Sequence, residues 1–219
     1  MRKRPDTKKL VLLAMMAAIA YLLAALIHIP LIPAAPFLSY EPKDVVITIA
    51  GFLMGPLASL VISLVVALLE MVTVSTTGII GCVMNFLASA CFCSLAALVY
   101  KKRRDIVGAV LGLLLGSVAM VCVMLLWNWL ITPLYMGVPR SAIEAMLLPC
   151  ILPFNALKVG FNTAMALMLY KPLVSALRKT GLIPQRPSQG KSAKWGIYVL
   201  AAALLVTCVL ILLVFRGIL

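Results

Sequence analysis

The sequence predicts an all-α integral membrane protein, a six-helix bundle followed by one additional C-terminal transmembrane helix. Of its 219 residues, 64% are hydrophobic and only 11% are charged, and the mean hydropathy is +1.16. Several apolar runs approach the roughly 20 residues that an α-helix needs to cross a bilayer. These runs are continuous, whereas the strands of a membrane barrel alternate polar and apolar residues. The composition therefore excludes a soluble domain, and the pattern excludes a barrel.

The basic residues predict the topology. The net charge is +13, and the lysines and arginines gather in three segments, residues 1–9, 101–104 and 171–194. Basic segments next to membrane helices stay in the cytoplasm, so we expect all three, and the N-terminus, on the inner side. Because these residues flank helices instead of forming one basic face, the charge does not indicate a nucleic-acid partner.

The first helix is expected from about Lys9 to Ile29, ending at a proline-rich loop that starts at Pro30. A basic start before an apolar run resembles a signal peptide, but no convincing cleavage site follows, so we interpret it as a retained helix. Ala14 and Ala18 are spaced four apart, which permits close approach of another helix. On this spacing alone, packing within the bundle is favoured over a partner surface.

The next two helices are expected at about 44–54 and from there to about Val74, with a break at Gly55-Pro56. Together they are too long for one crossing and short for two, which favours a tilted re-entry on the inner side. Glu70 lies near the end of the second of these helices. We expect its carboxylate to be solvated at the outer interface, in preference to a role in ligand binding.

A fourth helix is expected at about 80–100 and carries Asn85 and Ser89 on one face. Asn85 can bind a substrate or simply hydrogen-bond to a neighbouring helix. A fifth helix rises from Ile106 and ends near Trp127, Trp129 and Tyr135, aromatic residues typical of a membrane interface.

The C-terminal third begins with an outer connection that includes a short apolar segment at 145–150, and a sixth helix then runs from about 152 to Lys171. A basic linker within 171–194 leads to the additional helix, Trp195 to Phe215, which has no charge and is given no pocket role. We expect three parts: a membrane domain at 1–180, a linker at 181–194 and the extra helix at 195–219.

The polar residues of the sixth helix predict a binding pocket. Asn155 and Lys158 are three residues apart and Asn162 four further, so they share one helix face. Polar groups at this depth are costly and normally face a cavity or a partner. Asn128 lies near the outer end of the fifth helix, so it falls in the outer half of the membrane, as Asn155 and Lys158 do. We therefore expect a small-molecule pocket open to the outside.

The remaining candidate binding residues come from the outer loop and the interface aromatics. Tyr40 and Asp44 flank the start of the second helix. Asp44 either contacts the substrate or simply lies in the first turn of that helix, where the helix dipole favours a negative charge. The aromatic rings of Trp127, Trp129, Tyr135 and Phe154 are able to stack on a flat ligand, although the aromatic belt of a membrane interface accounts for such residues equally well. Amides, an ammonium and aromatic rings suit a heterocycle with carbonyl and imide groups.

The sequence contains no catalytic motif, no phosphate-binding P-loop and no CxxC pair. Six cysteines and the single His28 are better explained by packing than by a metal site. We therefore predict neither enzymatic activity nor a metal or cofactor, and any ATP-driven step requires another subunit.

In order and spacing, several segments together resemble the riboflavin-specific substrate-binding subunits (S components, RibU type) of energy-coupling factor (ECF) transporters. The similarity covers roughly residues 8–178. Its pieces are Ala14-Met15-Met16-Ala17-Ala18-Ile19-Ala20, Phe37-Leu38-Ser39-Tyr40-Glu41-Pro42-Lys43-Asp44, Ala50-Gly51-Phe52-Leu53-Met54-Gly55-Pro56, Asn85-Phe86-Leu87-Ala88, Asn128-Trp129, Pro133-Leu134-Tyr135 and Pro153-Phe154-Asn155 with Lys158.

The resemblance implies a multi-pass subunit of the bacterial cell membrane that binds riboflavin through Asn128, Asn155 and Lys158. It leaves open whether flavin mononucleotide is accepted. The resemblance also implies that Ala14 and Ala18 dock on a transmembrane coupling subunit joined to two cytoplasmic ATPases, and that uptake proceeds by toppling in the bilayer. This shifts the interpretation of the alanines towards a partner surface.

Two features depart from the family pattern: Glu41-Pro42-Lys43 in the outer loop, and the helix after Trp195, which either stabilises the module or restricts toppling. Two alternatives to riboflavin transport stay open. One is an S component for thiamine, folate or biotin. The other is an intramembrane enzyme or scaffold whose polar residues only hold helices together.

Overall fold

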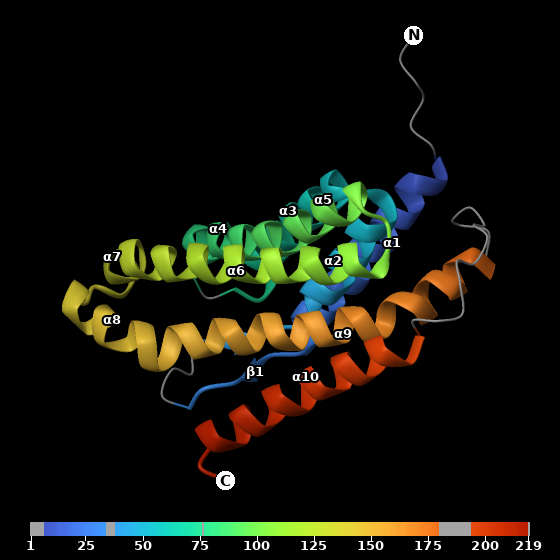
Figure 1. The fold of residues 1–219 in the computed structure, drawn as a ribbon. Coiled ribbons are helices and arrows are strands. Elements are labelled where there is room, and N and C mark those ends of the chain that lie inside the picture. The colour runs from blue at the N-terminus through green and yellow to red at the C-terminus, as the bar shows by residue number, and fades with distance from the viewer. Residues whose placement is uncertain (1–6, 34–37, 76, 180–193, 219) are drawn as a thin grey trace.

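The computed structural model describes residues 7–33, 38–75, 77–179 and 194–218, and helices account for most of them (Figure 1). The predicted all-α fold class is confirmed. The helices are α1 (Thr7–Leu26), α2 (Lys43–Met54), α3 (Pro56–Thr73), α4 (Gly78–Ser89), the π-helical turn η1 (Ala90–Ser94), α5 (Leu95–Lys102), α6 (Ile106–Leu130), α7 (Thr132–Met136), α8 (Arg140–Met146), the π-helical turn η2 (Leu147–Ile151), α9 (Leu152–Lys179) and α10 (Lys194–Phe215).

Six stretches of the described residues are long and apolar enough to cross a membrane. They are 7–26, 56–73, 78–102, 106–130, 140–173 and 195–215. The fourth of the expected helices is thus α4, η1 and α5 in continuous succession. The expected bundle corresponds to α1, α2, α3, α4–α5, α6 and α9, with α10 as the additional helix.

Helix α2 is the short member of the bundle, and it lies at the centre. Its 12 residues span only about 18 Å, which is less than the membrane core. Ten of them, Lys43 to Phe52, are buried. The predicted break at Gly55-Pro56 is confirmed: Gly55 has φ +102°, a conformation that favours glycine, and Pro56 opens α3. At this break the chain leaves the short, buried helix α2 and begins the longer helix α3.

A row of glycines on α6 brings two helices into backbone contact. Gly112 and Gly116 face α5 and η1 so closely that an added Cβ would lie 2.6 Å from the carbonyl oxygen of Ala96 and 2.4 Å from that of Phe92. Residues four apart share one helix face, and small residues there let helices pack without a side chain between them. The sequence analysis found this spacing only in α1.

The sixth expected helix is longer than predicted. Helix α9 does not end at Lys171 but continues through Pro172 to Lys179, so the start of the expected linker is helical. Pro172 is exposed. A proline inside a membrane helix is tolerated where neighbouring groups compensate for the lost hydrogen bond. The part of the linker at 180–193 lies outside the described residues.

Helix α10 packs along α9 and also reaches the loop between α1 and α2 (Figure 1). Cys208 approaches Gly160 of α9 and belongs to the same buried cluster as Leu31 and Leu38 of that loop. At the end of α10, Arg216 Nη2 donates a 2.8 Å hydrogen bond to the carbonyl oxygen of Pro30. The additional helix therefore braces the loop.

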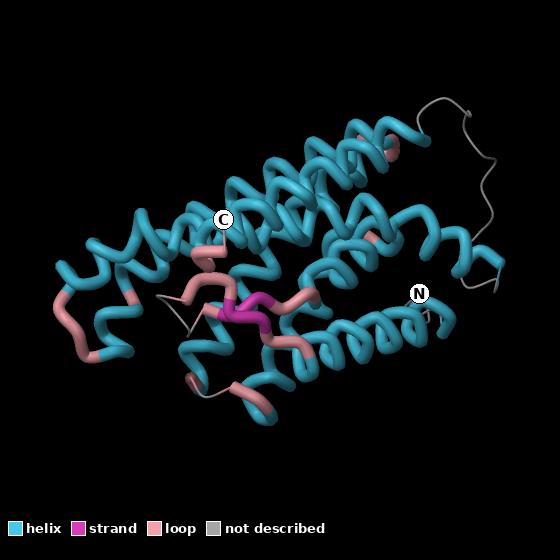
Figure 2. The backbone as a smooth tube through the Cα atoms, turned by 90° about the horizontal axis from the view of Figure 1, so that it is seen from below, coloured by secondary structure: helices cyan, strands magenta, loops and turns pink. Residues whose placement is uncertain are grey.

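The same loop contains the two short strands, β1 (Ile29–Pro30) and β2 (Ser39–Tyr40), which the sequence analysis did not predict. They pair antiparallel, Ile29 opposite Tyr40 and Pro30 opposite Ser39 (Figure 2). Backbone pairing closes the base of the loop, so the residues that follow Ser39 are held against the end of the bundle.

We predict that Gly116→Ala destabilises the protein, because the new methyl group meets the backbone of Phe92, which cannot move aside cheaply. The expected loss is about 1–3 kcal/mol of unfolding free energy. The measurement is the thermal midpoint of the detergent-purified protein. Gly196→Ala on α10 is the matched control, since no atom lies within 4 Å of its added Cβ. Equal midpoints for the two variants would contradict the close packing.

Candidate functional site

A cavity of about 180 Å³ lies at one end of the bundle, between the α1–α2 loop, the end of α3, α4, α6 and α9. Four of the six candidate substrate residues line it: Asn85, Asn128, Asn155 and Lys158. Its complete lining is His28, Leu38, Ser39, Glu41, Glu70, Val74, Ser75, Thr77, Met84, Asn85, Ala88, Met120, Met124, Asn128, Phe154, Asn155 and Lys158.

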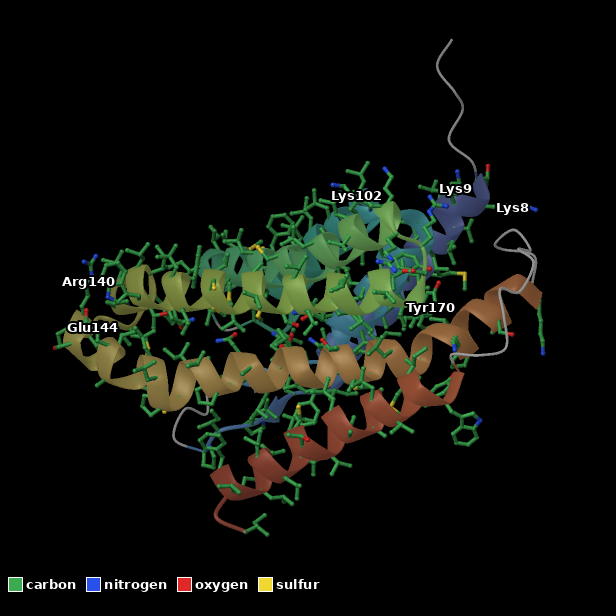
Figure 3. All side chains as sticks on the ribbon, in the orientation of Figure 1. Lys8, Lys9, Lys102, Arg140, Glu144 and Tyr170 are labelled. Carbon is green, nitrogen blue, oxygen red and sulfur yellow. The ribbon has the colours of Figure 1, made fainter. Side chains whose placement is uncertain are left out.

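The cavity lies at the end of the bundle opposite Lys8, Lys9 and Lys102 (Figure 3). Lys8 and Lys9 begin α1 and Lys102 ends α5, and these three lie at the same end of the molecule (Figure 3). Helix α1 runs from that end towards His28, and α6 runs from it towards Asn128, both of which line the cavity. The arrangement is the one that the topology prediction requires for an outward-facing pocket.

Lys158 is the distinctive group in the cavity wall. Its side chain is only 6% exposed, yet it makes no hydrogen bond and no salt bridge with any of the described residues. A buried ammonium without a partner is costly in apolar surroundings. The geometry therefore leaves one positive charge available to a molecule in the cavity.

The two asparagines beside Lys158 are held in place by their own helices. Asn155 Nδ2 donates to the carbonyl oxygen of Ile151 at 2.8 Å, and Asn128 Nδ2 donates to that of Met124 at 2.7 Å. Thr132 Oγ1 donates to Asn128 Oδ1. Within the described part of the chain, no donor reaches Asn155 Oδ1. This oxygen is an available acceptor next to the available ammonium.

Across the cavity lies an acid–lysine cluster, which we define as Glu41, Lys43 and Glu70. Lys43 Nζ lies 2.6 Å from Glu41 Oε2 and 2.6 Å from both Glu70 oxygens, so the ammonium joins the loop to the end of α3. Asn85 Nδ2 donates to Glu70 Oε2 at 2.9 Å, and His28 Nε2 lies 3.4 Å from Glu41 Oε1.

The expectation for Glu70 was wrong. Its side chain is not solvated at an interface but is 2% exposed, and it lines the cavity. The physical reason is Lys43, which is itself only 1% exposed. Its positive charge offsets the energetic cost of burying the Glu70 carboxylate. The sequence contains a signal that could have identified this pair: Glu70 is a carboxylate within an apolar helix, and Lys43 is a lysine at the start of another apolar helix.

The loop carboxylate of Glu41 is ionised at neutral pH. Burial by itself raises the pKa of Glu41, but the positive charges of Lys43 and Lys158 and the hydrogen bond from Lys43 outweigh it, so that the pKa lies below its ordinary value. Glu41 therefore adds a negative charge to the cavity wall, beside the Lys43 ammonium that binds both glutamates.

Tyr40 and Asp44, the other two candidate residues, are not part of the cavity wall. Asp44 lies in the first turn of α2 and is buried, with its oxygens accepting from Ser89 Oγ at 2.5 Å and Asn162 Nδ2 at 3.2 Å. The Tyr40 hydroxyl donates to Asn162 Oδ1 at 3.0 Å. These contacts form a buried network behind the cavity that joins the loop, α2, α4 and α9.

Among the four aromatic residues considered able to stack on a ligand, only Phe154 lines the cavity. Trp129 lies partly exposed at the end of the bundle, with its Nε1 donating to Glu144 and Arg140 above its ring at 5.3 Å. Tyr135 is exposed. Trp129 lies on α6 and Tyr135 on α7, and neither lines the cavity. Met120 and Met124 supply the apolar wall instead.

Comparison with known proteins places this architecture in a family. The family model for ECF transporter substrate-specific components matches residues 8–170. The chain is an S component of the ECF transporter family. The predicted resemblance is confirmed, and α10 lies beyond the matched residues, as expected. An S component serves transport, so this chain is a multi-pass membrane protein of a transport system.

Curated relatives and a solved structure agree with the family. The S component is 30% identical over 181 residues to the riboflavin transporter RibU of Staphylococcus aureus, covering 80% of this chain and 94% of that one. It is 32% identical over 160 residues to the riboflavin transporter FmnP of Bacillus subtilis, covering 69% and 84%. A solved S component of a bacterial ECF transporter superimposes with a TM-score of 0.66 at 30% identity, covering 78% of this chain and 98% of that one.

We predict that Lys43→Met destabilises this S component by about 3–5 kcal/mol, because two buried carboxylates then face each other without a cation. Denaturant or thermal unfolding of the purified protein measures the loss. Lys102→Met, an exposed lysine at the other end, should have no comparable effect. The double variant Lys43→Met/Glu70→Met should recover part of the loss. A Lys43→Met protein as stable as Lys102→Met would contradict the pairing.

Proposed function

We propose that this chain is the riboflavin-binding subunit of an ECF-type transporter in a bacterial cell membrane. It captures the vitamin from outside and releases it inward. The observation that carries the proposal is the ammonium of Lys158, which has no partner among the described residues, next to the free Oδ1 of Asn155 in the wall of the cavity. The names of the relatives add weight, since those proteins are riboflavin transporters.

The chemistry of the cavity fits the two halves of riboflavin. The ring system has a flat apolar face and an edge of carbonyl and imide groups, and its tail is a chain of hydroxyls. Phe154, Met120 and Met124 can cover the flat face. Lys158 donates to a carbonyl oxygen, and Asn155 Oδ1 accepts from an imide N–H. The hydroxyl tail suits the side of the cavity with Ser39, Ser75, Thr77 and Asn85.

The direction of transport follows from the topology. With the basic ends of α1 and α5 in the cytoplasm, the N-terminus is inside and the cavity opens outward. The chain has no P-loop, so the energy comes from two partner ATPases acting through a transmembrane coupling subunit. Toppling of the S component within the membrane then exposes the cavity to the cytoplasm.

The surface proposed for the coupling subunit is on α1. Ala14 and Ala18 are exposed, whereas Met16, Ala17 and Ala20 on the other side of the helix are buried against the bundle. The pair is therefore available to a partner helix, and the small side chains permit a close approach. Helix α10 packs on α9 and leaves this face of α1 open.

We predict that purified protein quenches riboflavin fluorescence and that Lys158→Met weakens riboflavin binding at least about tenfold, the effect of losing roughly 1.4 kcal/mol of interaction. Asn155→Ala should act in the same direction. Lys101→Met, an exposed lysine far from the cavity, is the control. Both variants retaining the affinity of the Lys101→Met protein would contradict the site.

The same titration separates the alternatives. Displacement of riboflavin by thiamine, folate or biotin, or binding of one of these in its place, would assign a different vitamin to the cavity. If no vitamin binds and the variants only lower stability, the polar residues serve structure alone.

We predict that Ala14→Leu/Ala18→Leu keeps riboflavin binding by the isolated subunit but abolishes uptake, because larger side chains hold the coupling subunit away. Binding is measured in detergent. Uptake of labelled riboflavin is measured in cells that also produce the coupling subunit and ATPases. Ala202→Leu, an exposed alanine on α10, controls for added bulk in the membrane. Normal uptake by the double variant would rule out this docking surface.

A further inference from the structure

The charged groups around the cavity differ in whether they have a partner of opposite charge within the protein. Lys43 is engaged by both Glu41 and Glu70 and does not line the cavity, whereas both carboxylates do. The acid–lysine cluster therefore contributes its two glutamates to the cavity lining, whereas its lysine is not a lining residue. Lys158 is the only lining lysine among the described residues, and it lies close enough to Glu41 to lower the pKa of that carboxyl.

This unequal pairing determines which chemical groups the side of the cavity can accept. An ionised carboxylate accepts hydrogen bonds and donates none, so a ligand must bring donors to Glu41 and Glu70. The neighbouring lining residues Ser39, Ser75 and Thr77 are hydroxyls that both donate and accept. A chain of alcohol groups meets these requirements, because each hydroxyl can donate to a carboxylate.

A phosphate ester does not meet them. It carries about −1.5 to −2 charge at neutral pH and presents acceptor oxygens. Tight phosphate binding normally relies on several cationic or backbone donors, often a bidentate arginine. The described lining contains no arginine and only one unpaired ammonium, and that ammonium faces two carboxylates. Like charges at a few ångströms repel strongly when water is largely excluded.

We propose that Glu41 and Glu70 are specificity-determining residues that favour free riboflavin over its phosphate ester, flavin mononucleotide. The proposal rests on the proposed function, since it concerns the same cavity. It assigns a role to the outer-loop segment Glu41-Pro42-Lys43: the carboxylate disfavours the phosphorylated ligand, and the lysine permits both carboxylates to be buried.

The test compares two dissociation constants, for riboflavin and flavin mononucleotide, on the full-length purified protein by fluorescence quenching. We expect flavin mononucleotide to bind at least about tenfold more weakly. In Glu41→Gln the loop loses its carboxylate charge while Lys43 keeps Glu70 as its partner. The ratio of the two constants should then shrink about tenfold towards equality.

Glu144→Gln is the matched control. It removes the same charge from an exposed position on α8, at a site that does not line the cavity (Figure 3). Its ratio should equal that of the unaltered protein. An identical change in both variants would indicate a general charge effect and overturn the proposal.

The remaining outcomes are also decisive. If the unaltered protein binds both flavins within about twofold, the carboxylates do not discriminate and the inference is wrong while the proposed function stands. This measurement needs no variant, so it is informative even where Glu41→Gln fails to fold. If neither flavin binds, the proposed function fails, and the inference with it. A ratio unchanged by Glu41→Gln would exclude Glu41 as its source.

Discussion

The structure depends on how two lysines are treated in apolar surroundings. Removing a charged group from water costs several kcal/mol unless another group compensates. Lys43 is compensated within the protein, by Glu41 from the loop and Glu70 from α3. Lys158 has no such partner among the described residues and lies in the wall of a cavity. Lys43 thus stabilises the contact between the loop and α3, whereas Lys158 has an ammonium group that a ligand can pair with.

Away from the cavity the bundle is closely packed. Gly112 and Gly116 let α6 lie directly against α5 and η1, and most of the short helix α2 is buried. The buried network of Tyr40, Asp44 and Asn162 holds the loop and α9 in register behind the cavity wall.

The additional helix α10 changes the periphery of the molecule but not its site. It packs on α9 and, through Arg216, on the loop that carries Glu41. It contributes no residue to the cavity wall. Because the matched family region ends at residue 170, this helix is an addition to the shared architecture. Its contacts suggest a brace for the outer loop, whose position determines how the cavity is closed.

The sequence by itself determined the features that arise within one helix or from one hydropathy pattern. Hydropathy predicted the helices, Gly55-Pro56 predicted the break between α2 and α3, and the three-residue spacing of Asn155 and Lys158 placed both on one face. The tertiary structure alone decided which distant elements meet. Lys43 and Glu70 are 27 positions apart and Asp44 and Asn162 118 apart, and no local periodicity states that such residues pair. For the same reason Glu70 was expected in solvent, and the sequence left open whether Trp129 and Tyr135 serve the interface or the pocket: residues of the two kinds look alike until the helices are packed.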